Sequence, residues 1–335
     1  MMYYHNYLKS SDYLDNKPYS IGANPYDADI TYNRLINLFP FDPTEPIEKN
    51  IVQMWKTKIT DPSFPYNEFF NQWTNLNPDY NHVIITNDEL SGLVNEYFNE
   101  KMPEIIQAFE LLPKPVLKSD FMRYIWIYIN GGFYCDMDVS ARAPINQWVD
   151  LRDDSIKGLV SLEGDFNTPD WEKWLPRRIQ FIQWALKFKK HHHALARVIA
   201  NIVKVTFEAR ASEKLVPYYK DFQDVDRCKS IDIMDWTGPG IFTDSIFEFL
   251  NDGDLNIIDY DSHRTNLNNE LFGPESGSSQ SLNNRVNWKT FTGIDSPVVV
   301  NGLGILPSSG FRCESEDVGK YCYARHWFSG GWKQG

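Results

Sequence analysis

The hydrophobic residues of this chain follow two recurring patterns. Short continuous apolar runs, typical of buried strands, alternate with longer segments in which apolar residues recur every three or four positions, as on one helix face. The runs predict strands at 51–55, 82–86, 133–135, 158–163, 298–300 and 304–306. The spaced segments predict helices at 64–76, 90–97, 105–109, 119–129, 171–187, 194–199 and 243–250. Strands that alternate with helices favour an α/β fold, with a mostly parallel central sheet and peripheral helices.

The stretch 118–138 carries the most informative of these patterns. Its helical half has Ser119 as the expected N-cap, and Gly131 and Gly132 end the helix because glycine tolerates a left-handed backbone. Asp136 and Asp138 follow directly at the end of the predicted strand 133–135. Side chains two apart on a strand point to the same side, so this pair predicts a hard-oxygen site for Mn²⁺ or Mg²⁺.

An Asp-x-Asp tripeptide alone is typical of a solvated turn, but its surroundings here favour a functional site. Asp120 and Arg123 lie one helical turn apart, so both are expected to face the cleft of the two aspartates. His326, near the C-terminus, is a candidate third metal ligand because imidazole suits Mn²⁺ better than Mg²⁺. The candidate catalytic residues are Asp120, Arg123, Asp136 and Asp138, and the candidate metal ligands are Asp136, Asp138 and His326.

Two other polar groups allow two interpretations each. Glu163 and Asp165 end a predicted strand, where they fit contact with sugar hydroxyls and equally fit a capping turn. The three histidines 191–193 favour a basic turn between two helices over a metal site, because consecutive histidines on regular structure cannot all face one ion.

Two further segments suggest ligand contact. Trp55, at the end of the first predicted strand, fits stacking on a nucleobase, the alternative being a core tryptophan. The segment 236–240 reads Trp-Thr-Gly-Pro-Gly, and its glycines allow the backbone to approach a ligand closely before a helix begins.

Composition and charge narrow the classes of function. The 335 residues are 42% hydrophobic and 23% charged, as in a globular protein with a sizeable core. The net charge of −12 argues against a nucleic-acid partner, because no basic surplus is present to neutralise phosphates. No run of 18 apolar residues occurs, so no segment of this chain is predicted to insert into a membrane.

The four cysteines are few, and their spacing suggests no zinc site. Cys313 and Cys322 flank a polar segment and predict a local disulfide of an oxidising compartment. Cys135, in the strand before the aspartates, is expected to be a buried thiol, and Cys228 is not assigned.

Around the two aspartates, the sequence resembles a known family. The pattern Asp-x-x-Arg…Gly-Gly-x-Tyr-x-Asp-x-Asp at 120–138 is similar to the signature of the DXD sugar-nucleotide glycosyltransferases, and more narrowly of the fungal Och-type α-1,6-mannosyltransferases of glycosyltransferase family 32. The resemblance runs from about residue 39 to the C-terminus, in order. Further matching stretches lie at 39–42, 53–56, 177–181, 235–240 and 326–333.

The resemblance implies a GT-A-like fold and a metal-dependent transfer of mannose from GDP-mannose to a high-mannose N-glycan, with an α-1,6 linkage and retention of configuration. It implies Mn²⁺, or Mg²⁺, on Asp136 and Asp138. It also implies that Ser329 and Trp332 belong to a lid over the donor diphosphate. The residues expected to contact the nucleotide sugar are Trp55, Asp120, Arg123, Tyr134, Gly238, Ser329 and Trp332.

Residues 1–38 are polar and lack clear periodicity, and residues 261–290 are rich in Asn, Ser and Gly. Together with the extent of the resemblance, these features suggest how the chain is organised. Residues 1–38 are expected to form a stem or irregular lead-in and 39–335 the catalytic domain, with a flexible insertion at 261–290. The expected location is the Golgi lumen, where membership of a mannosyltransferase complex is a further hypothesis. Three alternatives stay open: a UDP-sugar donor on the same scaffold, a catalytically silent subunit of a mannan-synthesising complex, and a metal-dependent glycan-binding module.

Overall fold

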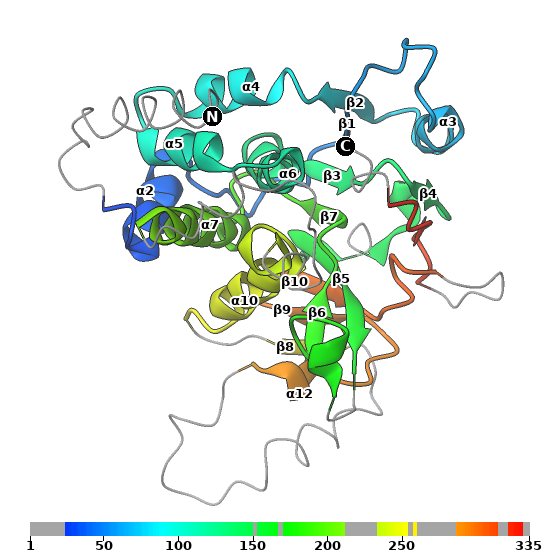
Figure 1. Cartoon of the computed structure of the whole chain (residues 1–335). Helices are drawn as coiled ribbons and strands as arrows, with labels where there is room; N and C mark the ends of the chain where they lie inside the picture. The colour runs from blue at the N-terminus through cyan, green and yellow to red at the C-terminus, as the bar shows by residue number, and fades with distance from the viewer. Residues whose placement is uncertain are drawn as a thin grey trace, which may run out of the picture.

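The computed structural model describes residues 24–149, 153–166, 170–211, 233–253, 257–259, 286–313 and 321–330. Within them, nine strands form one central sheet with helices around it (Figure 1). The strand order is β2 (Asn81–Thr86), β1 (Asn50–Trp55), β3 (Gly132–Cys135), β7 (Ala185–Phe188), β5 (Gly158–Asp165), β10 (Leu303–Leu306), β9 (Val298–Val300) and β8 (Ile257–Asp259), and β6 (Ile179–Phe181) pairs with β5. β4 (Val139–Ala141) and β11 (Ala324–His326) form a separate antiparallel pair.

Most strands of the central sheet point the same way. β2, β1 and β3 are mutually parallel, and β5, β10 and β8 share their direction. Among the described strands of this sheet, only β7, β9 and β6 run in the opposite direction. The predicted α/β class, with a mostly parallel sheet and peripheral helices, is confirmed.

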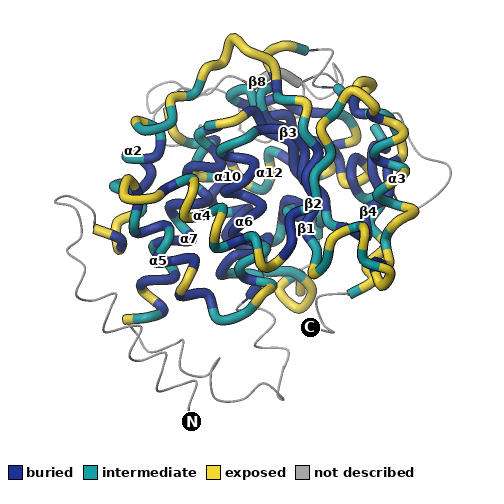
Figure 2. The backbone as a smooth tube through the Cα atoms, turned by 90° about the horizontal axis from the view of Figure 1, so that it is seen from above, coloured by how far each residue is buried: buried dark blue, intermediate teal, exposed yellow. Residues whose placement is uncertain are grey.

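The helices cover the sheet unequally. Most of them gather on one side of it, whereas α3 and the β4–β11 pair lie on the other (Figures 1 and 2). The described helices are α2 (Ala28–Leu38), α3 (Asn67–Leu76), α4 (Leu90–Phe98), α5 (Pro103–Leu111), α6 (Pro115–Asn130), α7 (His193–Ala211), α10 (Pro239–Leu250) and α12 (Trp288–Phe291), with short 3₁₀ turns η1 (Ile145–Gln147) and η3 (Trp171–Lys173).

Two hydrophobic clusters lie on opposite faces of the sheet. Val52 and Tyr134 belong to the cluster under the main helices, whereas their neighbours Ile51 and Phe133 belong to the cluster under α3. Successive side chains of a strand point to opposite faces, so burial of both sets requires cover on both sides. The sheet is therefore a central layer with both faces covered, so a substrate can reach it only at its edges and at the ends of its strands.

α6 is the buried helix predicted at 119–129, but it begins earlier. Pro115 occupies its first turn and Lys114 is the extended N-cap residue, so Ser119 lies inside the helix rather than at its cap. Proline suits the first turn because its missing N–H has no partner there. Gly131 ends the helix with φ 65°, and a Cβ on it would lie 2.8 Å from the backbone nitrogen of Lys190. The glycine stop is thus required by both backbone conformation and space.

The predicted helix at 171–187 is wrong. This segment holds the short turn η3 and then strands β6 and β7, the second of which inserts between β3 and β5. Pro176 interrupts a helix by removing a donor and crowding the preceding turn. Leu186 packs in one cluster and Ala185 in the other, so the buried run satisfies both faces of the sheet. Helical spacing of its apolar residues was coincidental.

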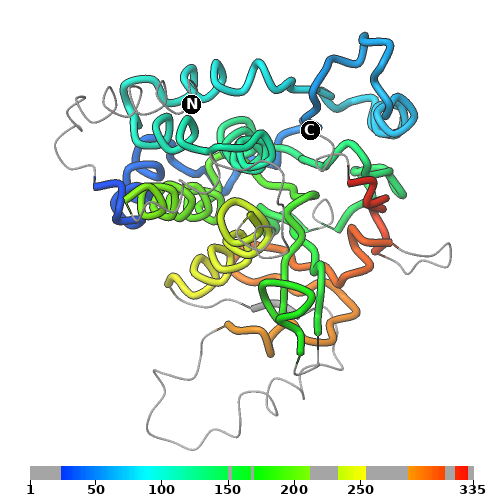
Figure 3. Tube along the Cα trace, viewed as in Figure 1, coloured from blue at the N-terminus to red at the C-terminus, as the bar shows by residue number. Residues whose placement is uncertain are grey.

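The N-terminal part of the chain also differs from the expectation. Residues 28–38 fold as α2 rather than as an irregular lead-in, with Asp27 as a side-chain cap and Leu35 fully buried. α2 lies along α7, blue beside green in Figure 3, and Arg197 of α7 stacks over Tyr32 at 4.0 Å. Residues 1–23 lie outside the described part of the chain.

The predicted insertion at 261–290 is described only from residue 286 onward, where α12 begins with a capping box at Asn287. No helix in the described residues is long and apolar enough to cross a membrane.

Candidate active site

The two aspartates lie in a tight turn rather than on a strand. β3 ends at Cys135, and the turn 136–138 links it to β4, closed by the Val139 N–H donating to the Asp136 carbonyl at 3.1 Å. The predicted strand geometry is corrected on this point, yet both carboxylates still face one region. Because β4 pairs with β11, the residue opposite Val139 is His326. β11, which carries His326, is the red segment beside β4 in Figure 1.

The structure brings together the three predicted metal ligands. One ligand atom each of Asp136, Asp138 and His326 lies within 4.8 Å of the others. His326 Nε2 is 3.3 Å from Asp138 Oδ1 and 4.0 Å from Asp136 Oδ2. Carboxylate oxygens with one imidazole nitrogen form a donor set that suits Mn²⁺, so the residues present fit a divalent ion.

The tautomer of His326 follows from its other ring nitrogen. The Phe328 N–H donates to Nδ1 at 3.0 Å, so a neutral imidazole carries its proton on Nε2 and donates it to Asp138. Ligation of an ion through Nε2 requires that proton to leave this atom.

Arg123 is the buried positive charge beside the aspartates. Its Nη2 donates to Asp120 Oδ1 at 2.7 Å and lies 3.4 Å from Asp136 Oδ1, and its side chain is about one-twentieth exposed, at 5%. Its guanidinium also lies over the Tyr134 ring at 4.8 Å. The Nε–H is buried and has no hydrogen-bond partner within the described part of the chain. One donor of Arg123 therefore remains available beside the metal-ligand group.

The partners of Asp120 and Asp136 complete this charged group. Burial raises the pKa of Asp120 to about 6, against the lowering effect of Arg123. Thr237 donates to Asp120 Oδ2 at 3.2 Å, and Tyr134 donates to Asp136 Oδ1 at 2.6 Å. The predicted one-turn spacing of Asp120 and Arg123 thus places both residues at the site.

Ser329 holds the second oxygen of Asp138. Its backbone N–H and its hydroxyl both donate to Asp138 Oδ2 at 2.8 Å, and Tyr66 lies 2.8 Å from the same hydroxyl. Burial disfavours the charged form of Asp138, but the hydrogen bonds from His326 and Ser329 outweigh it and lower its pKa to about 2. The C-terminal segment 326–329 is therefore attached to the site through Asp138.

An aromatic series forms the rim of the site. Trp55, half-buried at the end of β1, meets the Tyr66 ring edge-on at 4.9 Å. Tyr66 stacks on Phe69 at 6.2 Å, and Phe69 stacks on Trp327 at 6.0 Å. Trp55 is thus neither fully exposed nor a core residue, and its stacking on a nucleobase stays a prediction.

The loop at 236–240 reaches the site through Thr237 rather than through its glycines. Gly238 is buried at the start of α10, where a Cβ would lie 2.7 Å from Met234 Cα. The close approach that this glycine permits is to the chain itself, and its contact with a donor stays a prediction. Trp332, the other expected donor contact, lies outside the described residues.

The carboxylates at the end of β5 have separate roles. Glu163 accepts hydrogen bonds from Gln180 at 2.7 Å and from Trp184 at 3.2 Å, and burial raises its pKa. Trp184 in turn contacts the His326 ring, with ring centroids 4.5 Å apart. Asp165 instead caps a turn, accepting from Thr292 at 3.1 Å and from the Gly293 N–H at 2.6 Å. For Asp165 the capping interpretation accounts for both oxygens.

The three histidines form a turn, as predicted, but it joins strand β7 to α7 rather than two helices. His191 has a left-handed backbone with φ 62°, and His192 accepts the Ala194 N–H at 3.2 Å at the start of α7. Burial lowers the pKa of His192 to about 3. The described residues place no metal-ligand group here.

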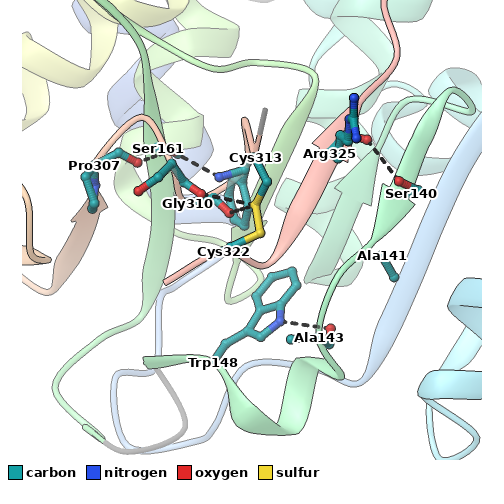
Figure 4. The surroundings of a disulfide bond; sticks show 12 residues. Ser140, Ala141, Ala143, Trp148, Ser161, Pro307, Gly310, Cys313, Cys322 and Arg325 are labelled. Atoms are coloured by element: carbon teal, nitrogen blue, oxygen red, sulfur yellow. Dashed lines mark hydrogen bonds between the residues drawn. A yellow bond between two sulfur atoms is a disulfide. The ribbon is translucent and has the colours of Figure 1, made fainter. Parts of the chain in front are cut away.

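The predicted disulfide between Cys313 and Cys322 is present, with Cα atoms 5.7 Å apart (Figure 4). The Cys313 N–H donates to the Ala324 carbonyl at 3.2 Å, so the disulfide supports the strand that carries His326. Cys135 is a buried free thiol, as expected, and Cys228 lies outside the described residues.

Sequence reasoning missed several residues that support the site. Tyr66 and Trp184 lie in segments whose periodicity predicted helices, and neither was a candidate site residue. Gln53 is the one omission with a sequence signal, because a polar amide between Val52 and Met54 in a buried strand is unusual.

The carboxylate–imidazole ligand group and the buried arginine lie at the carboxyl end of β3, where ligands of open α/β sheets commonly bind. Residues 65–153 match the family model described as the glycosyltransferase sugar-binding region containing the DXD motif.

The chain is 32% identical over 336 residues to the initiation-specific alpha-1,6-mannosyltransferase of Candida albicans. The alignment covers 96% of this chain and 80% of that protein. It is 30% identical over 389 residues to the Saccharomyces cerevisiae protein of the same name, with 88% and 80% covered. A solved structure named PaToxG Glycosyltransferase aligns with 66% of this chain and 76% of its own, at a TM-score of 0.39 and 16% identity. The chain belongs to the DXD glycosyltransferases, in the family of the initiation-specific α-1,6-mannosyltransferases.

Proposed function

We propose that this glycosyltransferase moves mannose from GDP-mannose to a mannose residue of a high-mannose N-glycan, forming an α-1,6 linkage with retention of configuration. The observation that carries the proposal is the group of Asp136, Asp138 and His326 beside the buried Arg123. Two relatives that match most of the chain are named for α-1,6-mannosyl transfer, which supports mannose as the sugar.

In this proposal Asp136, Asp138 and His326 hold Mn²⁺, or Mg²⁺. When bound, the ion offsets charge on the donor diphosphate and on the departing GDP. Arg123 supplies a fixed positive charge at the same place, in a buried setting where charge stabilisation is strong. Because the Arg123 guanidinium is held by Asp120, it needs no rearrangement when charge develops on the leaving group.

The donor is proposed to lie between the metal ligands and the aromatic rim. Trp55 stacks on the nucleobase, and Asp120, Arg123 and Tyr134 orient the sugar. Ser329 and Trp332 close over the diphosphate, with Gly238 nearby. Support for the Ser329 role comes from its two hydrogen bonds to Asp138, which place the C-terminal segment at the metal ligands.

The acceptor is proposed to be a neutral oligosaccharide. The net charge of −12 disfavours polyanionic acceptors, and Trp327 and Phe328 beside the site are about half exposed, at 49% and 55%. Aromatic faces of this kind stack on sugar rings. Glu163 is proposed near the acceptor, since it is linked to His326 through Trp184. A Golgi lumen location fits the disulfide, which forms in oxidising compartments. Membership of a mannosyltransferase complex is part of the same proposal.

One experiment separates donor from acceptor. Purified chain is incubated with Mn²⁺ and a panel of GDP- and UDP-sugars, first with a high-mannose N-glycan and in parallel with an inositol phosphoceramide. Products are read by mass spectrometry and linkage analysis. We expect α-1,6-mannose on the N-glycan from GDP-mannose alone. Transfer from a UDP-sugar would refute the donor, and mannose on the ceramide alone would refute the acceptor. The absence of transfer to any acceptor, with metal bound, would instead favour a silent subunit.

A further inference from the structure

A buried amide lies directly behind the metal-binding turn 136–138. Gln53 is the fourth residue of β1 and is fully buried, between the apolar Val52 and Met54. Burying an amide is unfavourable unless its polar atoms are hydrogen-bonded, so such a residue in a central strand requires a reason. None of the proposed donor contacts uses it.

The amide of Gln53 holds the backbone of the turn. Its Nε2 donates to the Asp136 carbonyl at 3.2 Å and lies 3.4 Å from Cys135 Sγ, and its Oε1 faces His82 Nε2 at 3.0 Å. Only the NH₂ group can face a carbonyl oxygen, so the orientation of this amide is fixed by chemistry. The Asp136 N–H donates to the Trp184 carbonyl at 2.9 Å, which holds the other side of the same residue.

His82 fixes the amide in turn. Since Gln53 Oε1 accepts, His82 must carry a proton on Nε2. Its Nδ1 lies 2.8 Å from the Thr74 hydroxyl, whose single proton also faces the Phe70 carbonyl at 3.1 Å. Phe70 stacks on the imidazole with ring centroids 4.0 Å apart. A neutral imidazole satisfies both contacts, in agreement with burial lowering the pKa of His82 to about 4.

We propose that Gln53, oriented by His82, is a positioning residue of the metal site. It fixes the backbone at Asp136, and thereby the directions from which the Asp136 and Asp138 carboxylates approach the ion. Partners of metal ligands commonly set ligand orientation in this way. The inference rests on the metal site of the proposed function, but it concerns residues that touch neither the ion nor the substrates.

The test measures Mn²⁺ affinity without turnover, by following the electron paramagnetic resonance signal of free Mn²⁺ in a titration, together with the melting temperature. Gln53→Met keeps the volume of the side chain and removes its hydrogen bonds. The matched control is Asn77→Leu, because Asn77 is another buried amide. It is bonded to the Trp73 carbonyl at 2.9 Å and to the Ile145 N–H at 2.7 Å, rather than to residues 136–138. We expect the Mn²⁺ Kd to rise roughly tenfold or more in Gln53→Met and to stay unchanged in Asn77→Leu.

His82→Leu is the second variant. It keeps the amide of Gln53, so it tests the inference even if Gln53→Met does not fold. We expect a smaller rise in Kd, and no further rise when His82→Leu is added to Gln53→Met, because His82 acts through Gln53. An unchanged Kd in Gln53→Met, an equal rise in Asn77→Leu, or additive effects of the two site variants would each overturn the inference while leaving the proposed function intact. Failure of the wild-type chain to bind Mn²⁺ would overturn both.

Discussion

Substitution of Asp138 by asparagine tests the proposed metal site most directly. The change keeps the shape of the side chain and removes one ligand charge. It also weakens the attachment of the C-terminal segment, because the carboxylate accepts from the Ser329 N–H and hydroxyl and from His326. An amide has one acceptor oxygen, so it cannot satisfy Ser329 and the protonated Nε2 of His326 together.

The size of the stability loss can be estimated in two ways, both of which describe the hydrogen bonds that Asp138 accepts. Hydrogen bonds to a charged group contribute about 1.5–3 kcal/mol each, and at least one is lost. The lowering of the Asp138 pKa from 3.8 to about 2 corresponds to roughly 2 kcal/mol of preference for the charged form in the folded state. We therefore expect Asp138→Asn to lower the free energy of unfolding by about 2 kcal/mol.

The matched control is Asp165→Asn. Asp165 also accepts two hydrogen bonds, from Thr292 and the Gly293 N–H, but belongs to no ligand group in the described residues. Urea unfolding should show a similar loss of stability for both variants. Mn²⁺ titration and the mannosyl-transfer assay should show a loss for Asp138→Asn alone. Wild-type Mn²⁺ affinity or turnover in Asp138→Asn would refute the assignment of Asp138 as a ligand.

Three further predictions concern charge, pH and the disulfide. Arg123→Met should abolish transfer and lower the free energy of unfolding by roughly 3–5 kcal/mol, because buried carboxylates lose their partner; a urea midpoint within error of the wild type would contradict this. Burial lowers the pKa of His192 from 6.5 to about 3, so on acidification His192 is protonated in the unfolded chain before it is protonated in the folded chain. The free energy of unfolding should therefore decline as pH falls from 6.5 towards 3, by about 1.4 kcal/mol per pH unit. Unfolding measured between pH 7 and 5 should show a shallower decline in His192→Asn. Replacing Cys313 and Cys322 by serine should cost about 3 kcal/mol and raise the Mn²⁺ Kd, because the strand carrying His326 loses its support; a lowered melting temperature with unchanged Kd would limit the disulfide to a stabilising role.

Local sequence patterns determined much of this protein. The apolar face of α6, the glycines that end it and the aspartates that follow are set by helix periodicity and backbone conformation, which act over a few residues. The one-turn spacing of Asp120 and Arg123 is of the same kind, and so is the pairing of Cys313 with Cys322. Each of these predictions depends on neighbours in the chain, and the structure agrees with them except that the aspartates lie in a turn rather than on the strand.

The tertiary structure alone decided which distant segments complete the site. Ser329 binds Asp138 across 191 positions of sequence, and Gln53 reaches Asp136 across 83. These contacts depend on the pairing of β1 with β3 and of β4 with β11, and strand pairing is set by packing between segments that carry no local signal of one another. The same reason explains the wrong helix at 171–187, because burial of β7 between β3 and β5 overrides the local spacing of its apolar residues.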